Sequence, residues 1–506
     1  MRLKHVPFLL LLMAALAIGS LTVADFGQSW DEASMYGYAN YALQDYRFLR
    51  NPVELAEYRP ENLIRSSYYI AGGVTARFLT RISPSWTSTN AWHFVYFVTF
   101  LCGAAALYSL AGRWMSTASA LAVVLLYMSQ PVFWGHAFIN PKDIPLMAVF
   151  VASIWSGFRM TDGLRGAARI DGRVVPAAIL VGVACSLRVA GPLAGLIVLV
   201  YTVYRLRRKA LPLAGAYILI GAVTTYLSWP FLWNAPINRY WSTVGAMADF
   251  GWNQRVLFAG RIYEASQLPA SYLPTFLAIQ LTEPALLLCL GGIAFAVADL
   301  LRRRVQAPIL LFLAWSVGPA MLILALHSTL YDNGRQTYFL LPPLFIVAGL
   351  AFERLFMLVK SPSIKALIIL LAVLPGIVAD VRLHPYEYVY YNALVGGTGG
   401  AYRRYEMDYW ATSMKETTEY LNSIAAAPIN VRVYGPPAEI MTPYARRGVN
   451  IYGPPGGAVR YDYLVMLIRA ARGDDYCQTA PIAYKVEREG AVFSIVRRSP
   501  DGAPCH

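Results

Sequence analysis

The stretch VPAAILVGVACSLRVAGPLAGLIVLVYTVY occupies residues 175–204 and carries a single charged side chain, Arg188. A helix needs about 20 mostly apolar residues to cross the hydrocarbon core of a bilayer. The stretch exceeds one such span, and Gly191-Pro192 lies in its middle. Because glycine and proline weaken or break a continuous helix, we predict a hairpin of two short or tilted transmembrane helices.

The charges on either side of this stretch favour the same interpretation. Basic residues gather at 159–173 before it and at 205–209 after it. Cytoplasmic loops of membrane proteins carry an excess of Lys and Arg. One long helix would place the two basic loops on opposite sides of the membrane, whereas a hairpin keeps both in the cytoplasm.

The composition of the whole chain also indicates a membrane protein. Its 506 residues are 57% hydrophobic and 14% charged, with a mean hydropathy of +0.44. Soluble domains carry roughly 25% charged residues. The formal charge of +14 could indicate nucleic-acid binding, but the basic residues form short runs between apolar segments. That pattern is typical of membrane topology, so we predict no nucleic-acid partner.

Working outward from the hairpin, we predict about eleven spans, with the N-terminus in the cytoplasm and the C-terminus outside. Residues 7–24 are interpreted as an uncleaved first helix, since no clear small-x-small site precedes Asp25. The other spans are predicted at 91–111, 116–134, 144–158, both halves of 175–204, 211–229, 271–298, 308–326, 337–353 and 364–381. Every dense basic run between spans then lies on the cytoplasmic side.

Two domains are predicted. Residues 1–381 form a transmembrane module with a long outer loop at 25–90, and residues 382–506 form a small α/β domain outside the membrane. The tail has ordinary polarity, with a helix-like segment at 414–424 and strand-like segments at 430–434, 461–468 and 491–497. The predicted fold class is therefore an α-helical polytopic membrane protein with a small C-terminal α/β domain.

The first outer loop contains an adjacent pair of carboxylates, Asp31 and Glu32, followed by aromatic residues that begin with Tyr36. A carboxylate at the membrane surface can act as a general base towards a hydroxyl or amine. Aromatic rings suit stacking on sugars. The alternative is an acidic helix N-cap followed by an interfacial aromatic belt.

The second outer loop, WGHAFINPKDIP at 134–145, brings His136, Lys142 and Asp143 together between two spans. Polar groups at this density need partners where desolvation is costly. The alternative for Asp143 is to cap the following helix, whose first turn holds Pro145. Both descriptions can apply, and such a carboxylate can also hold an acceptor or a metal ion.

Three further positions stand out. Trp233 lies in WPFLWN at 229–234, and Arg335 ends the loop before a predicted span. An arginine there can clamp a phosphate with two charge-assisted hydrogen bonds, or it can simply extend its charge to the interface. Arg188 within the hairpin needs a carboxylate, carbonyls or an anionic lipid head group, and it can also stabilise the bundle.

Five cysteines divide into two groups. Cys102, Cys185 and Cys289 lie in apolar segments and are expected to pack in the core. Cys477 and Cys505 lie in the tail, where an oxidising exterior would allow a disulfide between them.

The order of these motifs resembles the GT-C glycosyltransferases. An Asp-Glu pair follows the first span, a second Asp lies in the next outer loop, and an Arg precedes a Leu-Pro-Pro helix. WPFLW at 229–233, RQTYFLLPP at 335–343 and HPYEYVYYN at 384–392 with DYW at 408–410 are similar to the branch of protein O-mannosyltransferases and lipid A aminoarabinose transferases. The resemblance covers most of residues 1–415.

This resemblance implies an inverting transfer of a sugar from a polyprenyl phosphate to an acceptor on the outer face of a bacterial inner membrane. It implies Asp31 as catalytic base with Glu32 beside it and Arg335 on the donor phosphate. Asp143 matches the second-loop acid, and Asn140 is the competing match at that position. The remaining candidates are Lys142, His136 and Arg188 for the phosphate, and Tyr36, Trp233 and Tyr338 for the sugar or acceptor. A divalent metal held by Asp31 and Asp143 is an option that the resemblance leaves open, because some members of the family use a metal and others do not.

The acceptor stays open between a protein, lipid A, another glycan and a lipid, and membrane lipids are general partners. The competing function is a transporter or flippase for a lipid or sugar-lipid. Such a protein would place polar residues near the membrane midplane on broken helices. Arg188 with its Gly-Pro break fits that pattern, while the long outer loops rich in polar and aromatic residues do not.

Overall fold

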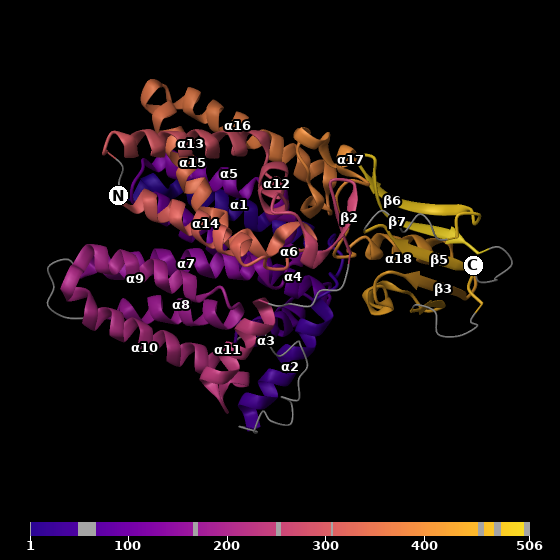
Figure 1. The fold of residues 1–506 in the computed structure, drawn as a ribbon. Coiled ribbons are helices and arrows are strands. Elements are labelled where there is room, and N and C mark those ends of the chain that lie inside the picture. Colours follow the sequence, from indigo (N-terminus) through magenta and orange to yellow (C-terminus); the bar gives the residue numbers. More distant parts are fainter. Residues whose placement is uncertain are drawn as a thin grey trace.

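A bundle of helices separates the two ends of the chain. The computed structural model describes residues 2–48, 67–164, 171–248, 255–304, 307–453, 460–469 and 477–499. Figure 1 shows the N-terminus at one end of the bundle and the C-terminal sheet beyond the opposite end. The helices that build the bundle are α1 (Val6–Thr22), α4 (Ser88–Ala111), α5 (Thr117–Met128), α7 (Asp143–Gly163), α8 (Val174–Leu187), α9 (Pro192–Leu206), α10 (Ala210–Ser228), α13 (Glu283–Leu301), α14 (Ala307–Ala325), α15 (Pro342–Leu358) and α16 (Pro362–Leu383).

Many of these helices have the length and composition of membrane spans. Within the described residues, six helical runs qualify, and the number rises to eight if two bent helix pairs each count as one span. The helices α1 and α8 are shorter and apolar. The protein is an α-helical multi-pass membrane protein, and each predicted span coincides with an apolar helix or helix pair.

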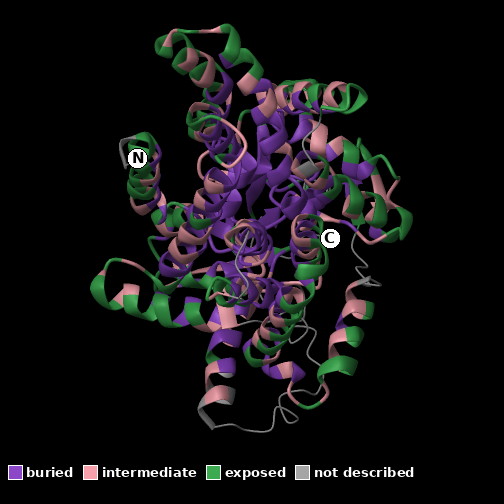
Figure 2. Ribbon diagram, turned by 90° about the vertical axis from the view of Figure 1, so that its left-hand side faces the viewer, coloured by how far each residue is buried: buried purple, intermediate pink, exposed green. Residues whose placement is uncertain are grey.

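The outside of the bundle is apolar, as a lipid-facing surface must be. Figure 2 shows buried residues gathered in the middle of the molecule and exposed ones at its edge. Large apolar side chains on the outer helices are strongly exposed, for example Leu10 at 59%, Leu219 at 65% and Leu371 at 58%. Soluble proteins rarely expose contiguous apolar surface on this scale, so lipid chains are the solvent that this face requires.

The predicted break inside residues 175–204 is present. The helix α8 ends at Leu187, Arg188 has an extended backbone, and α9 begins at Pro192. Proline is favoured in the first turn of a helix because it has no N–H to leave unpaired there.

Three of the predicted spans contain a break between two helices. Segment 116–134 bends by 63° between α5 and α6 (Pro131–Ile139), and segment 337–353 bends by 65° between η6 (Asp332–Leu340) and α15. Segment 271–298 divides into α12 (Tyr272–Ile279) and α13. In each case a proline lies in the first turn of the second helix, and it starts a new helix there.

The outer loops contain structure that hydropathy alone does not reveal. The described part of loop 25–90 forms α2 (Glu32–Phe48) and α3 (Ser67–Ile82). The loop after α10 forms α11 (Pro236–Ala248) and an antiparallel hairpin of β1 (Arg255–Phe258) and β2 (Arg261–Glu264). These elements are less apolar than the spans and were therefore not predicted from apolar runs.

The C-terminal region has the predicted α/β character. The helix α18 (Met414–Ile424) packs on a five-stranded sheet of order β4-β3-β5-β7-β6. Strands β3 (Ile429–Tyr434), β5 (Tyr463–Leu467) and β7 (Ala491–Arg498) match the predicted strands. Strands β4 (Val449–Tyr452) and β6 (Ile482–Arg488) were missed because both are edge strands with a single buried side chain each.

The segment between α16 and the sheet packs into the helical bundle. It contains η7 (Glu387–Val389), η8 (Ala393–Val395) and α17 (Gly397–Ala401). The buried rings of Tyr388 and Trp410 belong to the same apolar core as the helices, whereas a separate core under the sheet includes Ala411. The division into domains at residue 381 stays a prediction.

Of the three cysteines expected in the core, Cys289 is buried and Cys185 is partly buried. The prediction was wrong for Cys102, which is exposed on α4, because a position in an apolar span can face outward as well as inward. Cys102, Cys185 and Cys289 are free thiols, and Cys477 takes part in a disulfide. Its predicted partner, Cys505, lies outside the described residues, so this pairing also stays a prediction.

Candidate active site

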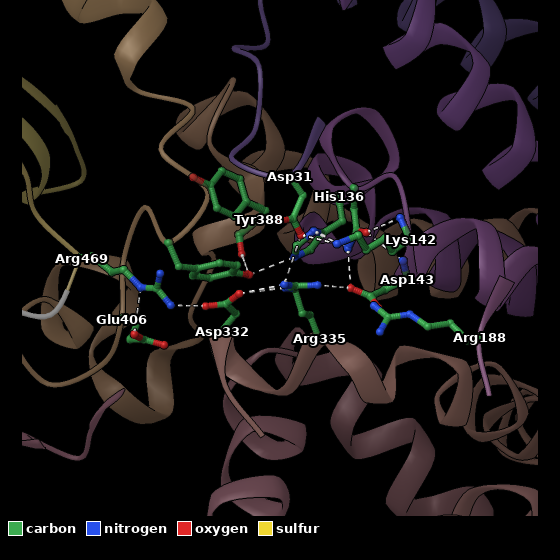
Figure 3. A network of polar contacts seen from close by, with 12 residues as sticks. Asp31, His136, Lys142, Asp143, Arg188, Asp332, Arg335, Tyr388, Glu406 and Arg469 are labelled. Atoms are coloured by element: carbon green, nitrogen blue, oxygen red, sulfur yellow. Dashed lines mark hydrogen bonds and ion pairs between the residues drawn. The ribbon is translucent and has the colours of Figure 1, made fainter. Parts of the chain in front are cut away.

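A network of charged side chains lies between the helical bundle and the C-terminal region (Figure 3). Asp31 immediately precedes α2, and Asp143 is the first residue of α7. Arg188 occupies the break between α8 and α9, and Arg335 lies in η6 before the bend into α15. Four segments that are far apart in the sequence therefore place charges at one point, each where a helix begins or is interrupted.

Asp143 is the buried centre of the network. Its Oδ2 accepts hydrogen bonds from Arg335 Nη1 at 2.6 Å and from Asn140 Nδ2 at 3.1 Å. Its Oδ1 accepts one from Arg188 Nη2 at 2.5 Å. The side chain is only 2% exposed. A buried carboxylate is costly unless it is paired and hydrogen-bonded, and two guanidinium groups with the start of α7 meet that need.

Asp31 is the accessible carboxylate of the network. Its side chain is 30% exposed, and its Oδ2 accepts a hydrogen bond from Lys142 Nζ at 2.9 Å. Arg335 Nη2 lies 3.8 Å from the same oxygen. Burial raises the pKa of Asp31, but the charges of Lys142 and Arg335 outweigh burial and hold this pKa below its ordinary value. Asp31 is therefore ionised at neutral pH.

The surroundings of Lys142 also shift its pKa. Burial lowers the pKa of Lys142, the carboxylate of Asp31 raises it, and the nearby Arg188 and Arg335 lower it further. The net result is a pKa below the ordinary value for lysine. An additional anion beside Lys142 would oppose that shift and strengthen the positive charge.

A second row of charges continues from Arg335 towards the sheet. Asp332 Oδ2 accepts from Arg335 Nε at 3.1 Å and Nη2 at 2.9 Å. Its other oxygen pairs with Arg469, which follows β5 and also donates to Glu406 Oε1 at 3.3 Å. Burial raises the pKa of Glu406 to about 7, although Arg469 lowers it. Residues Asp332, Glu406 and Arg469 were not among the predicted site residues.

His136 is attached to the network without contacting its arginines. Asn140 Nδ2 donates to His136 Nδ1 at 3.2 Å, and His136 Nε2 is hydrogen-bonded to the Tyr409 hydroxyl at 2.9 Å. The ring of Tyr338 lies 5.1 Å from the imidazole. Asn140 therefore joins His136 to Asp143, and its sequence signal is its place four residues after His136 and three before Asp143.

Two predicted residues lie in a separate buried cluster. Glu32 accepts hydrogen bonds from the Ser29 amide at 2.6 Å and the Tyr36 hydroxyl at 2.8 Å. It is also bonded to His93 Nε2 at 3.1 Å, and its side chain is fully buried. The structure does not bring Glu32 to the partners of Asp31. Tyr36 is likewise held by Glu32, with its ring stacked on Trp92.

Trp233 lies outside the network as well. Its indole Nε1 donates to the Tyr226 carbonyl at 2.8 Å, and its ring meets Tyr46 edge to face at 5.2 Å. These contacts fasten the turn between α10 and α11 to the end of α2.

A cavity of about 260 Å³ opens at the network. Lys142, Arg188 and Arg335 form its cationic part, together with the polar side chains of Gln336 and Tyr331. Its apolar wall comes mainly from α8, α9 and α14 and includes Leu146, Leu187, Leu193, Trp229, Pro319, Leu322, Ile323 and Phe339. Positive charge at one part and an apolar wall elsewhere suit an anionic head group on a long apolar chain.

The two carboxylates do not form a good metal site. Both oxygens of Asp143 are occupied by guanidinium groups, and Asp31 is paired with Lys142. Across the described ranges, no group of three or more His, Cys, Asp and Glu side chains is placed to hold an ion. Three protein cations stand where a divalent ion would be needed, so no step of the chemistry is assigned to a metal.

Comparisons with solved structures identify the fold. ArnT from Cupriavidus metallidurans in the apo state superposes with a TM-score of 0.53 at 13% identity, covering 99% of each chain. ArnT bound to undecaprenyl phosphate gives the same TM-score at 12% identity and the same coverage. The chain has a GT-C fold.

The oligosaccharyltransferase AglB of Archaeoglobus fulgidus, tethered to an acceptor peptide, gives a TM-score of 0.47 at 12% identity. That match covers 92% of this chain and 70% of AglB. No protein-family model and no curated protein sequence matches the chain. At these identities the GT-C likeness concerns the fold, and the chemistry must be argued from the site.

Proposed function

We propose that this protein transfers a sugar from a polyprenyl-phosphate donor to a hydroxyl- or amine-bearing acceptor, with inversion at the anomeric carbon. The observation that carries the proposal is the position of Asp31, an accessible ionised carboxylate beside a cavity with three cationic side chains and an apolar wall. The ArnT structure with undecaprenyl phosphate supports the same donor class, because it has the same fold.

The donor phosphate is assigned to Lys142, Arg188 and Arg335. Each of them lines the cavity and carries a positive charge. Among the described residues, Arg188 Nε and both amide atoms of Gln336 have no hydrogen-bond partner although they are buried. Unpaired buried polar groups cost free energy, which a ligand with phosphate and sugar oxygens would recover. The prenyl chain would follow the apolar wall between α9 and α14.

Asp31 is assigned as the general base. It takes the proton from the acceptor O–H or N–H while the acceptor atom forms a bond to the anomeric carbon. The bond from that carbon to the phosphate oxygen breaks, and the polyprenyl phosphate leaves with the electron pair. The three cationic side chains that line the cavity stabilise the negative charge that grows on the leaving phosphate. Attack from the face opposite the phosphate inverts the configuration.

We place the reaction at the outer face of a bacterial inner membrane, with the N-terminus in the cytoplasm and the C-terminal domain outside. The basic runs at one end of the bundle support this orientation, and the site lies at the opposite end, next to the sheet.

The test is transfer of radiolabel from polyprenyl-phosphate sugars to acceptors in membranes that contain the wild type or Asp31→Asn. General-base catalysis contributes about 10²–10⁴-fold, so we expect the variant to lose about 10³-fold in transfer rate. Its free energy of unfolding should stay at the wild-type value. The matched control is Asp171→Asn. Asp171 is an exposed carboxylate just before α8 that pairs with Arg173, and this variant should keep wild-type activity. Full transfer by Asp31→Asn would remove Asp31 from this role. Donor movement across the bilayer without any transfer would favour a flippase.

A further inference from the structure

A second cavity, of about 450 Å³, lies between α1, α5 and α16 and shares no lining residue with the cavity at Arg335. The helix α6 separates it from the charged network, since Trp134 lines this cavity while His136 is bonded to Tyr409. Most of its wall is apolar and comes from α1, α5 and α16: Leu11, Ala14, Ala15, Ile18, Leu125, Met128, Val373, Ile377 and Val381. An apolar chain fits this part of the cavity.

The other part of the cavity is acidic. Asp380 in the last turn of α16, His384 and Glu387 all line it. His384 Nδ1 is bonded to Glu387 Oε1 at 2.7 Å, and His384 Nε2 to Asp25 Oδ2 at 3.0 Å. Glu387 is only 1% exposed. Within the part of the chain that the structure describes, Glu387 Oε2 and Asp380 Oδ1 are buried with no hydrogen-bond partner.

The cluster holds more carboxyl groups than basic groups. His384 is the one basic side chain that lines the cavity. Burial lowers the pKa of His384, but its bonds to Glu387 and Asp25 raise this pKa to about 8. Two further cations are near but paired elsewhere. Arg488 donates to the backbone carbonyl of His384, and its guanidinium pairs with Glu416 at 2.7 Å.

The second nearby cation is Lys415, which contacts the backbone carbonyls of Ala24 and Asp25 and lies 3.8 Å from Glu419. The cluster therefore joins three carboxyl groups, those of Asp25, Asp380 and Glu387, to one imidazole. Two buried carboxylate oxygens without donors call for a ligand with several N–H donors and a positive charge.

We propose that this cavity binds a membrane lipid whose head group carries a primary ammonium, with the ammonium between Asp380 and Glu387 and an acyl chain between α1 and α16. A primary ammonium supplies three N–H donors, enough for both unpaired oxygens. The site borders the loop that carries Asp31, because His384 packs edge-on against Phe26. The proposal concerns binding and does not rest on glycosyl transfer.

The test is lipid retention by the purified full-length protein in native mass spectrometry. Phosphatidylethanolamine and phosphatidylcholine with identical acyl chains are the probes, since they differ only in the three methyl groups that remove the N–H donors. We expect the wild type to retain phosphatidylethanolamine at least fivefold better. Asp380→Asn with Glu387→Gln should abolish that preference, whereas the exposed Glu419→Gln should keep it.

A third variant keeps the test decisive if the double variant does not fold. Ala14 is an exposed residue of α1 that lines the cavity, and Ala14→Trp would fill the space for the acyl chain. We expect this variant to lose the selectively retained phosphatidylethanolamine. Equal retention of both lipids by the wild type would overturn the proposal, as would an unchanged preference in Ala14→Trp or in the folded double variant.

Discussion

Asp31 and Glu32 are adjacent in the sequence, yet they lie in two regions with different chemistry. Asp31 is partly exposed and has the side chains of Lys142 and Arg335 as partners. Glu32 is fully buried, and its partners are a backbone amide, a tyrosine hydroxyl and His93. The helix α2 begins between the two residues, so their side chains leave in different directions. Asp31 is accessible to an acceptor and can take up its proton. Glu32 is enclosed by three hydrogen-bond partners and instead stabilises the packing of the helices.

The largest expected effect comes from removing the cation that joins the charged network. Arg335→Ala leaves Asp143 and Asp332 each without one partner in a buried site. Removing one member of a buried ion pair costs about 3–5 kcal/mol, so we expect a loss of that size in the free energy of unfolding, measured in detergent. Arg335→Lys keeps a charge and should lose less. A fully stable Arg335→Ala protein would show that the network does not stabilise the fold.

The second effect concerns pH. Because Glu406 has a pKa of about 7 in the folded protein and an ordinary value near 4.5 when unfolded, the folded state binds the extra proton between these values. The free energy of unfolding should therefore fall as the pH rises from 4.5 to 7, by up to about 3 kcal/mol. Glu406→Gln should flatten this slope. An identical slope in the variant would assign the pH dependence to another group.

The third effect tests the enclosed region. Glu32→Gln keeps the shape of the side chain but removes the charge that accepts from Ser29, Tyr36 and His93. A lost hydrogen bond to a buried charged group costs about 1–3 kcal/mol. We expect a loss of about 2 kcal/mol in the free energy of unfolding and a transfer rate that stays within about threefold for the folded protein. The exposed Glu419→Gln is the control. A loss of transfer as large as that expected for Asp31→Asn would place Glu32 in the catalytic machinery after all.

The class of protein and much of the fold could be predicted from the sequence, because the signals are local. The length of each apolar run indicates a span, the basic runs indicate its orientation, and Gly191-Pro192 indicates a helix break. The sequence also selected Asp31, Lys142, Asp143, Arg188 and Arg335, which the structure places in one network. It could not separate Glu32 from Asp31, since the start of α2 between them leaves no strong local signal. It also missed Arg469, because that residue follows a short strand and reaches the site only through the packing of the C-terminal region on the bundle.

Arg469 gives the smallest expected effect and tests how far the charged network extends. It pairs with both Asp332 and Glu406 through one guanidinium. A lysine carries the same charge on a single nitrogen and does not reproduce the planar two-sided contact. In Arg469→Lys, Asp332 loses some of its contacts with the second of its two cationic partners. Asp332 then pairs more strongly with Arg335. Arg335 then becomes less available to a phosphate in the cavity.

We therefore expect Arg469→Lys to raise the KM for the polyprenyl-phosphate donor about tenfold, equivalent to about 1.4 kcal/mol, with kcat nearly unchanged. Arg497→Lys is the matched control, because Arg497 is a buried arginine of β7 in the same C-terminal region but donates to the backbone carbonyls of Gln478 and Ala480. A structural role alone would make both variants less stable and leave both KM values at the wild-type level. A rise in KM confined to Arg469→Lys would instead show that the C-terminal region positions Arg335 for the donor, so that the network with Asp31 includes both parts of the molecule while the Glu32 cluster stays within the helices.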